Sequence, residues 1–218
     1  EINEGDWSSD VCSSDLFVTG LAERTGLTGA TISTVMRRLL DEGLVEESGR
    51  AASTGGKPRT FVSVVPDARF AVGVHLTRTD MVLVLTDLLG AIVGRIRRPV
   101  AAGEGGTALA MREAVEEIIT GTGTDRGRVV GVGVAVSGLV RAELTASVHN
   151  GDPNRLEEHL SRSLGLPVLI DNDASAAALG EWWVSPTGRT DNALVVYLGA
   201  GIGGGNEEIG RASCRERV

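Results

Sequence analysis

Residues 164–181 read Leu-Gly-Leu-Pro-Val-Leu-Ile-Asp-Asn-Asp-Ala-Ser-Ala-Ala-Ala-Leu-Gly-Glu, and this stretch decides the fold class. Its short apolar run at 168–170 predicts a buried strand that is entered from a Gly-Leu-Pro turn. The alanine-rich run that follows predicts a helix. The side chains of Asn172 and Asp173 are therefore expected at the carboxyl end of a strand and at a helix N-terminus, where ligands of α/β sheets bind. A carboxylate beside an amide suits a polyhydroxylated ligand, because each group can bridge neighbouring hydroxyls. The alternative interpretation of Asp171, Asn172 and Asp173 is a helix cap and turn only.

Strands and helices are expected to alternate around this stretch. The predicted order is strands at 70–76, 81–87 and 91–100, a helix at 109–119, a strand at 129–136, a helix at 153–164, the strand and helix just described, and a strand at 193–198. This order is that of an α/β layered domain. The nearly continuous apolar run at 129–136 predicts a strand that is covered on both faces. Near the end of the third strand, Arg95, Arg97 and Arg98 are expected to be solvated.

A glycine-rich run, Gly199-Ala-Gly-Ile-Gly-Gly-Gly205, follows the last predicted strand. Glycine lets the backbone approach phosphate oxygens and offer its amide groups to them. The candidate phosphate-loop residues are Gly199, Gly201, Gly203 and Gly204. By composition alone the run also fits an ordinary turn, and both interpretations stay open.

A second pattern, at 19–47, predicts a helix-turn-helix. A short helix carrying Leu21 and Ala22 ends at Gly26, and Thr28 can cap the next helix. Apolar residues recur on that second helix at helical spacing, namely Ile32, Val35, Met36, Leu39 and Leu40. The remaining positions face away from the apolar stripe, and a helix of this kind can enter a major groove. The candidate DNA-binding residues on it are Thr31, Ser33, Thr34, Arg37 and Arg38.

Two strands around a basic loop are expected after this helix and would form a wing. The first strand begins at 43–45, the glycine-rich loop covers 48–60, and the second strand covers 61–65. Lys57 and Arg59 in the loop are candidate contacts to phosphates or to the minor groove. The bland alternatives are a solvated surface helix at 31–40 and plain wing-tip charges at the two basic residues. The predicted domain boundaries are 17–66 for a winged helix-turn-helix and 67–207 for the α/β domain.

The charge distribution fits a DNA-reading head on an acidic body. The chain carries a formal net charge of −8, of which residues 1–16 contribute −5 and residues 208–218 contribute +1, so residues 17–207 carry −4. Within that part, residues 17–61 hold six basic and five acidic side chains, a net charge of +1, and the remainder is acidic. A body of this charge is not expected to touch nucleic-acid phosphates. No run of 18 or more apolar residues and no signal peptide is visible, so we expect a cytoplasmic protein that does not enter a membrane.

Both ends of the chain are expected to be foreign to the protein. Residues 1–16 and 208–218 read as translated short-read sequencing adapters, which leaves a fragment of a longer chain between them. Cys12 and Cys214 both lie in these segments, so the remainder has no thiol for a disulfide or a metal site. His149 and His159 have no metal-ligand spacing, and no metal site is expected in the fragment.

The segments 164–181 and 197–205 resemble the sugar site and the second phosphate segment of the ROK family of repressors and sugar kinases. The resemblance implies an actin-like, ribonuclease-H-like fold, incomplete in this fragment, in which Asn172 and Asp173 hydrogen-bond sugar hydroxyls. Members with a winged helix in front are sugar-responsive transcription repressors. The head at 17–66, which lacks most of its first helix, therefore implies operator DNA, a sugar or sugar derivative, and a second copy of the chain as partners.

One segment departs from the family pattern. Kinases of the family have Asp-Ile-Gly-Gly-Thr-Lys where this chain has His75-Leu-Thr-Arg-Thr-Asp80, so both loop glycines are gone and a carboxylate that should repel a triphosphate replaces a cation. We therefore expect no enzyme activity and no cofactor in this fragment. The alternative is a glucokinase-like sugar kinase using ATP and Mg²⁺, with Asp173 as general base; a third is an interaction module without a ligand. The family's zinc cysteines would lie beyond Gly205.

Overall fold

The computed structural model describes residues 16–50, 60–100, 106–138, 140, 142, 154–184, 192–198, 202–208 and 211–214. The elements in chain order are β1 Leu16–Phe17, α1 Val18–Thr25, α2 Gly29–Asp41, β2 Val45–Arg50, β3 Thr60–Val64, η1 Pro66–Ala68, β4 Phe70–Leu76, β5 Asp80–Asp87, β6 Ile92–Pro99, α3 Gly106–Gly121, η2 Arg126–Arg128, β7 Val129–Val136, α5 Asn154–Leu164, β8 Val168–Asn172, α6 Asp173–Val184, β9 Asn192–Leu198, β10 Ile202–Glu208 and β11 Arg211–Cys214. Their order agrees with the predicted alternation of strands and helices.

The head is a helix-turn-helix packed on a three-stranded sheet of order β1-β3-β2. Gly26 ends α1 with φ +68°, a conformation that suits glycine because it has no Cβ. Ile32 and Met36 of α2 are buried against Val62 of β3 and form the small core of the head. The apolar stripe predicted on the second helix therefore faces the sheet, although Val35 at its margin is exposed.

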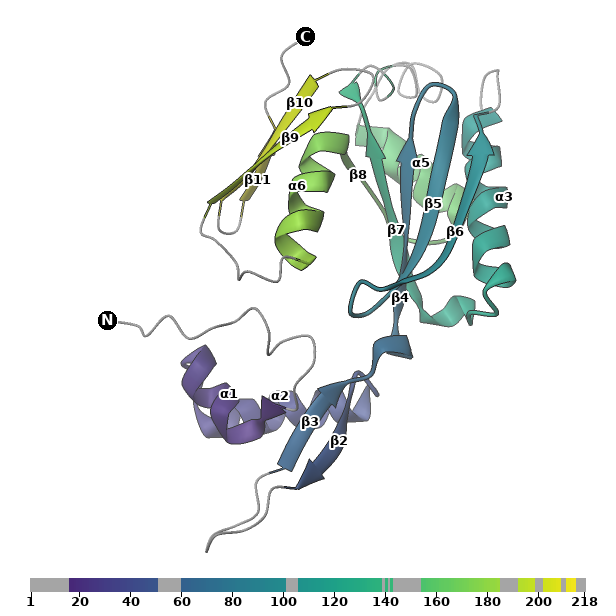
Figure 1. Ribbon diagram of the computed structural model, residues 1–218. Helices are drawn as coiled ribbons and strands as arrows, with labels where there is room; N and C mark the ends of the chain where they lie inside the picture. Colours follow the sequence, from purple (N-terminus) through teal and green to yellow (C-terminus); the bar gives the residue numbers. More distant parts are fainter. Residues whose placement is uncertain are drawn as a thin grey trace, which may run out of the picture.

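The body is built on a five-stranded sheet of order β6-β5-β4-β7-β8 (Figure 1). β4, β5 and β6 pair antiparallel, whereas β4, β7 and β8 pair parallel. In register, Leu76 lies opposite Val136, and Val136 lies opposite Asn172. The carboxyl ends of the three parallel strands therefore meet at one edge of the sheet.

One face of this sheet packs on α3 and α5 and contains the core of the body (Figure 1). Alternate residues of each strand point into that core, as the burial of every second residue of β4 shows. The expectation that residues 129–136 are covered on both faces is wrong for the part of the chain that the structure describes. Val132, Val134 and Val136 are buried, but Val130 is 55% exposed. The alternate positions include glycine and alanine, so the run holds fewer large apolar side chains than its hydropathy suggests.

Side chains of α5 cover the outer edge of strand β8. Ser161 accepts a hydrogen bond from the Val168 amide at 3.0 Å, and Glu157 accepts one from the Ile170 amide at 2.9 Å. Unpaired amides of an edge strand would otherwise recruit another strand. Among the described residues β8 is therefore the edge strand of this sheet, with its outer amides covered by α5.

A second sheet of order β11-β10-β9 lies on the other side of α6 (Figure 1). Gly203 and Gly204 are strand residues here, paired with Tyr197 and Val196, while Gly199 and Gly201 lie outside the described residues. Any turn between β9 and β10 is thus shorter than the glycine run. Strand β11 lies in the segment that we attribute to an adapter. Strands pair through their backbones whatever the origin of the sequence. The pairing of β11 therefore does not test the attribution, which stays a prediction.

Candidate functional site

The carboxyl edge of β4, β7 and β8 is the first candidate site. Asn172 ends β8 and Asp173 begins α6, as the sequence predicts, so both side chains lie at this edge. The turn from Thr77 to Asp80 follows β4 at the same edge. The tertiary structure therefore brings the predicted sugar segment and the degenerate phosphate turn together across the sheet.

Asn172 caps helix α6. Its side-chain oxygen accepts the amide of Ala174 at 2.8 Å and that of Ser175 at 3.4 Å, which satisfies two of the four free amides of a helix N-terminus. The helix-cap interpretation of this segment is thus correct for the oxygen of Asn172. The side-chain NH₂ group of Asn172 remains as a donor to a ligand. Asn172 can therefore donate to a hydroxyl, but its oxygen is not free to accept from a second one, as the bridging role expected from the sequence would require.

Asp173 offers the complementary acceptor. One carboxylate oxygen accepts the amide of Ala174 at 2.9 Å, which places the carboxylate in the first turn of α6. Asp171, two residues earlier, is exposed, and within the part of the chain that the structure describes it bonds locally, accepting the amide of Asn172 at 2.7 Å. A hydroxyl bound at this edge can donate to Asp173 and accept from Asn172.

Ser175 is a polar residue of this site that sequence reasoning missed. It is 4% exposed, and its hydroxyl has no hydrogen-bond partner among the described residues. A buried hydroxyl without a partner costs free energy. The only signal in the sequence is a serine interrupting an alanine run, which could not reveal that the position is buried.

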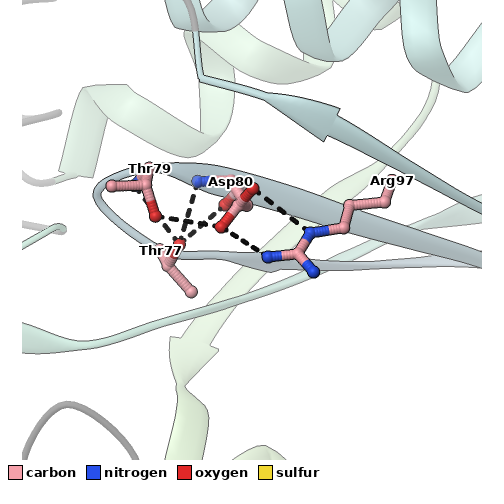
Figure 2. A network of polar contacts seen from close by, with 4 residues as sticks. All are labelled: Thr77, Thr79, Asp80 and Arg97. Carbon is pink, nitrogen blue, oxygen red and sulfur yellow. Dashed lines mark hydrogen bonds and ion pairs between the residues drawn. The ribbon is translucent and has the colours of Figure 1, made fainter.

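The turn after β4 is closed by its own side chains (Figure 2). The Thr77 amide donates to the Asp80 carbonyl at 2.8 Å, and the Asp80 amide donates to the Thr77 hydroxyl at 3.0 Å. The Thr79 hydroxyl donates to the Asp80 carboxylate at 2.9 Å. The Thr79 amide also donates to the Thr77 hydroxyl, at 3.3 Å, so three backbone amides of the turn are used internally and a phosphate placed there would have to displace these bonds.

Arg97 of β6 neutralises the charge of this turn. Its guanidinium donates from Nε and Nη2 to the two carboxylate oxygens of Asp80, at 3.2 and 2.8 Å (Figure 2). The hydrogen bond from Arg97, followed by that from Thr79, lowers the pKa of Asp80. Arg97 and Arg98 are exposed to solvent, as expected, but both are also paired: Arg98 forms an ion pair with Glu117 of α3. The carboxylate of Asp80 is therefore paired. What opposes binding of a triphosphate here is the closed turn, and not the repulsion by an unpaired carboxylate that the sequence suggested.

We expect the Asp80–Arg97 pair to make stability depend on acid pH. Because folding lowers the pKa of Asp80, the pair stabilises the folded state above the unfolded pKa of about 3.9, and that stabilisation is lost as the pH falls through the lower folded value. The difference in urea midpoint between the parent and Asp80→Asn should be largest at neutral pH and shrink below about pH 4. Glu113→Gln, on the exposed face of α3, is the control; a difference for Asp80→Asn that stays constant from pH 7 to 3 would contradict the assignment.

The exposed face of α2 is the second candidate site. Thr28 caps the helix, with its hydroxyl accepting the Thr31 amide at 3.2 Å, as predicted. All five predicted base-reading or backbone-contacting residues of the helix are exposed, namely Thr31, Ser33, Thr34, Arg37 and Arg38. The helix thus buries one side in the head and presents the other to solvent.

The polar groups on α2 are not equally available to a partner. The Ser33 hydroxyl donates to the Gly29 carbonyl at 2.8 Å, and the Thr34 hydroxyl donates to the Ala30 carbonyl at 3.1 Å. Arg38 pairs with Glu42 at 2.7 Å. Arg37 has no ion pair within the part of the chain that is described. Of the two arginines predicted on this face, Arg37 is therefore the one whose guanidinium can contact a base or a phosphate without first breaking an ion pair.

The wing is present as the antiparallel pair of β2 and β3, with an irregularity between Glu47 and Gly49. Lys57 and Arg59 lie outside the described residues, so their predicted contacts stay predictions.

Among the described residues no group of three potential ligands could hold a metal ion. In the same part of the chain, no helix combines the length and the apolar character needed to cross a membrane.

The chain resembles known regulators and kinases over most of its length. The model of the ROK family matches residues 71–208. A putative xylose repressor of Caldicellulosiruptor sp. strain Rt8B.4 is 30% identical over 202 residues, which cover 88% of this chain and 51% of the relative. The chain spans about half the length of the curated relatives that it matches.

Two solved structures share its fold. A ROK family transcriptional regulator, described as a homologue of the E. coli MLC protein, aligns with a TM-score of 0.71 at 21% identity, over 91% of this chain and 52% of its own. A ROK family glucokinase from Streptomyces griseus, in complex with glucose and AMPPNP, aligns with a TM-score of 0.54 at 27% identity, over 68% of this chain and 47% of its own. The predicted actin-like, ribonuclease-H-like fold class is confirmed. With the winged head, the mixed sheet and the matched segment 71–208 in agreement, the chain belongs to the ROK family.

Proposed function

We propose that this protein is a sugar-responsive, DNA-binding transcriptional regulator that acts as a repressor. The observation that carries the proposal is a winged helix-turn-helix joined to a ROK body whose first phosphate turn is closed by Asp80 and Arg97. Curated relatives of similar coverage are named as xylose repressors and as an N-acetylglucosamine repressor. Sensing by binding alone would need no ATP and no metal ion.

The proposed DNA contact is made by α2 in the major groove. Arg37 would contact a guanine edge or a phosphate, while the hydroxyl oxygens of Ser33 and Thr34 can accept from base amino groups. A single helix reads a short half-site, so we propose that a second copy of the chain supplies the other half. Lys57 and Arg59 of the wing would add contacts to phosphates or to the minor groove.

The proposed ligand is an aldose or amino sugar bound at the carboxyl edge of the body. Asp173 would accept from one hydroxyl and the Asn172 amide would donate to the next, in the cytoplasm where the operator lies. Because the two sites belong to one molecule, any effect of the sugar on operator affinity must equal the effect of the operator on sugar affinity.

The direct test measures operator affinity of the full-length parent with and without D-xylose, N-acetylglucosamine and D-glucose. We expect one sugar to change the operator Kd by about 5- to 150-fold, the range of ordinary coupling free energies. Operator binding that no sugar changes would contradict sensing, and failure to bind any promoter fragment of the neighbouring genes would contradict the regulator itself.

Replacing Arg37 by alanine should weaken operator binding. Loss of a base contact costs about 1–3 kcal/mol, which is roughly a 5- to 150-fold rise in Kd. The matched control is Arg95→Ala, an exposed arginine of β6 in the body, which should leave the Kd unchanged. Equal affinity of the Arg37→Ala variant and the parent, measured by fluorescence anisotropy, would remove Arg37 from the DNA interface.

A sugar kinase is the second candidate, favoured by the structural likeness to a glucokinase that binds glucose and AMPPNP. In that case Asp173 would take the proton from the attacking hydroxyl. The closed turn at 77–80 argues against it, since the turn's own amides are occupied. ATP-dependent phosphorylation of a hexose in a coupled assay, abolished by Asp173→Asn, would favour the kinase over the regulator.

A further inference from the structure

Along the connection between head and body, the backbone hydrogen bonds pass from the head to the body between two neighbouring residues, Val65 and Pro66. The Val65 amide donates to the Leu44 carbonyl of the head at 3.0 Å. The carbonyl of the next residue, Pro66, accepts from the Leu88 amide of the body at 2.9 Å. Because the peptide bond itself is planar, the φ and ψ bonds of Val65 are the pivot about which the head can move.

This pivot has little conformational freedom. The proline ring fixes φ of Pro66, and a residue before proline is confined to extended conformations; Val65 accordingly has φ −87° and ψ 104°. The following turn, η1, is closed by a bond from the Ala68 amide to the Val65 carbonyl at 3.1 Å, and Ala68 is buried. The link is a stiff turn rather than a flexible tether.

Arg128 holds this turn against the body. Its Nη1 donates to the Asp67 carbonyl at 3.1 Å and lies 3.5 Å from the Asp67 carboxylate, across 61 residues of sequence. Arg128 ends η2, a turn that is itself capped by Asp125, whose side chain accepts the Gly127 amide at 2.9 Å. The guanidinium is thus presented from a fixed position to the link between the two domains.

The two strands that start at this junction end at the candidate sugar site. One residue separates the end of η1 from the start of β4, and β7 follows Arg128 directly (Figure 1). They pair in parallel from Phe70 opposite Val129 to Leu76 opposite Val136. The paired strands therefore connect the junction to the candidate sugar site as one continuous element of the sheet.

We infer that Arg128 is a positioning residue: it clamps η1 to the amino end of β7, so that the orientation of the DNA-binding head follows the sheet that carries the sugar site. The role of the clamp in regulation rests on the proposed function, whereas the clamp itself does not. Without the Arg128 contact, the head would keep its fold and its DNA-binding face but sample more orientations, because η1, to which the head is joined, would be held less firmly on the body.

The test measures the distance between head and body directly. Spin labels at Glu46→Cys on β2 and Thr120→Cys on α3, both exposed positions, are introduced in a Cys12→Ser, Cys214→Ser background of this chain. Pulsed EPR should give one narrow distance distribution for the parent. Arg128→Ala should broaden it, with a roughly two- to fivefold rise in displaced orientations, the range expected for an exposed ion pair.

Matched variants separate a clamp from a general loss of structure. Arg128→Lys keeps one donor and should restore most of the narrow distribution, Pro66→Gly should broaden it by freeing the pivot, and Arg112→Ala on α3 should change nothing. Urea midpoints should stay within the error of the parent for Arg128→Ala and Arg112→Ala. A narrow distribution in Arg128→Ala would overturn the clamp, whatever Pro66→Gly shows, and so would broadening by Arg112→Ala to the same degree.

The same variants distinguish failure of the clamp from failure of the proposed function. In the full-length parent, Arg128→Ala should leave the affinity for a single operator half-site unchanged and reduce the preference for correct half-site spacing by about the same two- to fivefold factor. A full-length protein that binds no operator would refute the regulator while the EPR result still stands. Unchanged spacing preference together with unchanged distances would refute the clamp alone.

Discussion

The Leu83→Ala variant should lose about 2–5 kcal/mol of its free energy of unfolding. Leu83 is 0% exposed and lies in β5, opposite Val74 of β4 and Ile96 of β6. Truncation removes buried methyl groups and leaves a cavity beneath α3, which the paired strands on both sides prevent from collapsing. Urea unfolding followed by circular dichroism measures the loss as a shift of midpoint at constant slope.

Leu169→Ala is the matched control for this prediction. Leu169 is also a strand leucine, in β8, but it is 74% exposed on the opposite face of the sheet. Its truncation should cost less than about 1 kcal/mol, since little apolar surface is removed from the folded core. Similar losses for the two variants would mean that the outer face is covered in solution and that the buried core does not dominate stability.

The Asp173→Asn variant should bind the cognate sugar about 10- to 150-fold more weakly, which corresponds to about 1.5–3 kcal/mol for hydrogen bonds to a charged group. The substitution keeps the size of the side chain and one oxygen that can still accept the Ala174 amide. It removes the negative charge toward which sugar hydroxyls would donate. Isothermal titration of the full-length parent and the variant, with the sugar that changes operator affinity, measures the effect.

Asp171→Asn is the control, because it removes the same charge two residues away from an exposed side chain at the end of β8. It should leave the sugar Kd within about twofold of the parent, as expected for a screened surface charge. Equal losses for Asp171→Asn and Asp173→Asn would indicate a general electrostatic effect and would refute a direct hydrogen bond from Asp173. Operator affinity without sugar should be the same in both variants.

Local features of this protein could be predicted from the sequence because they depend on neighbouring residues. The helical spacing of Ile32 and Met36 defines the buried side of α2, and the hydroxyl of Thr28 reaches an amide three residues on. The position of Asn172 and Asp173 at a strand end and a helix start follows from the run of residues around them. Each of these contacts spans less than one helical turn or one strand.

Contacts between distant elements were decided by the tertiary structure alone. Asp80 meets Arg97 because β5 and β6 pair in one particular register, and Arg128 meets Asp67 because β7 lies beside β4. Shifting β6 against β5 by one residue would turn Arg97 to the other face of the sheet, away from Asp80. Asp67 and Arg128 lie in the turns η1 and η2 that precede the paired strands, so their contact depends on where those strands are placed. The burial of Ser175 likewise depends on what packs against α6. Short-range spacing therefore determined the elements and the candidate residues, whereas strand register and packing decided which charges are paired and which turn is closed.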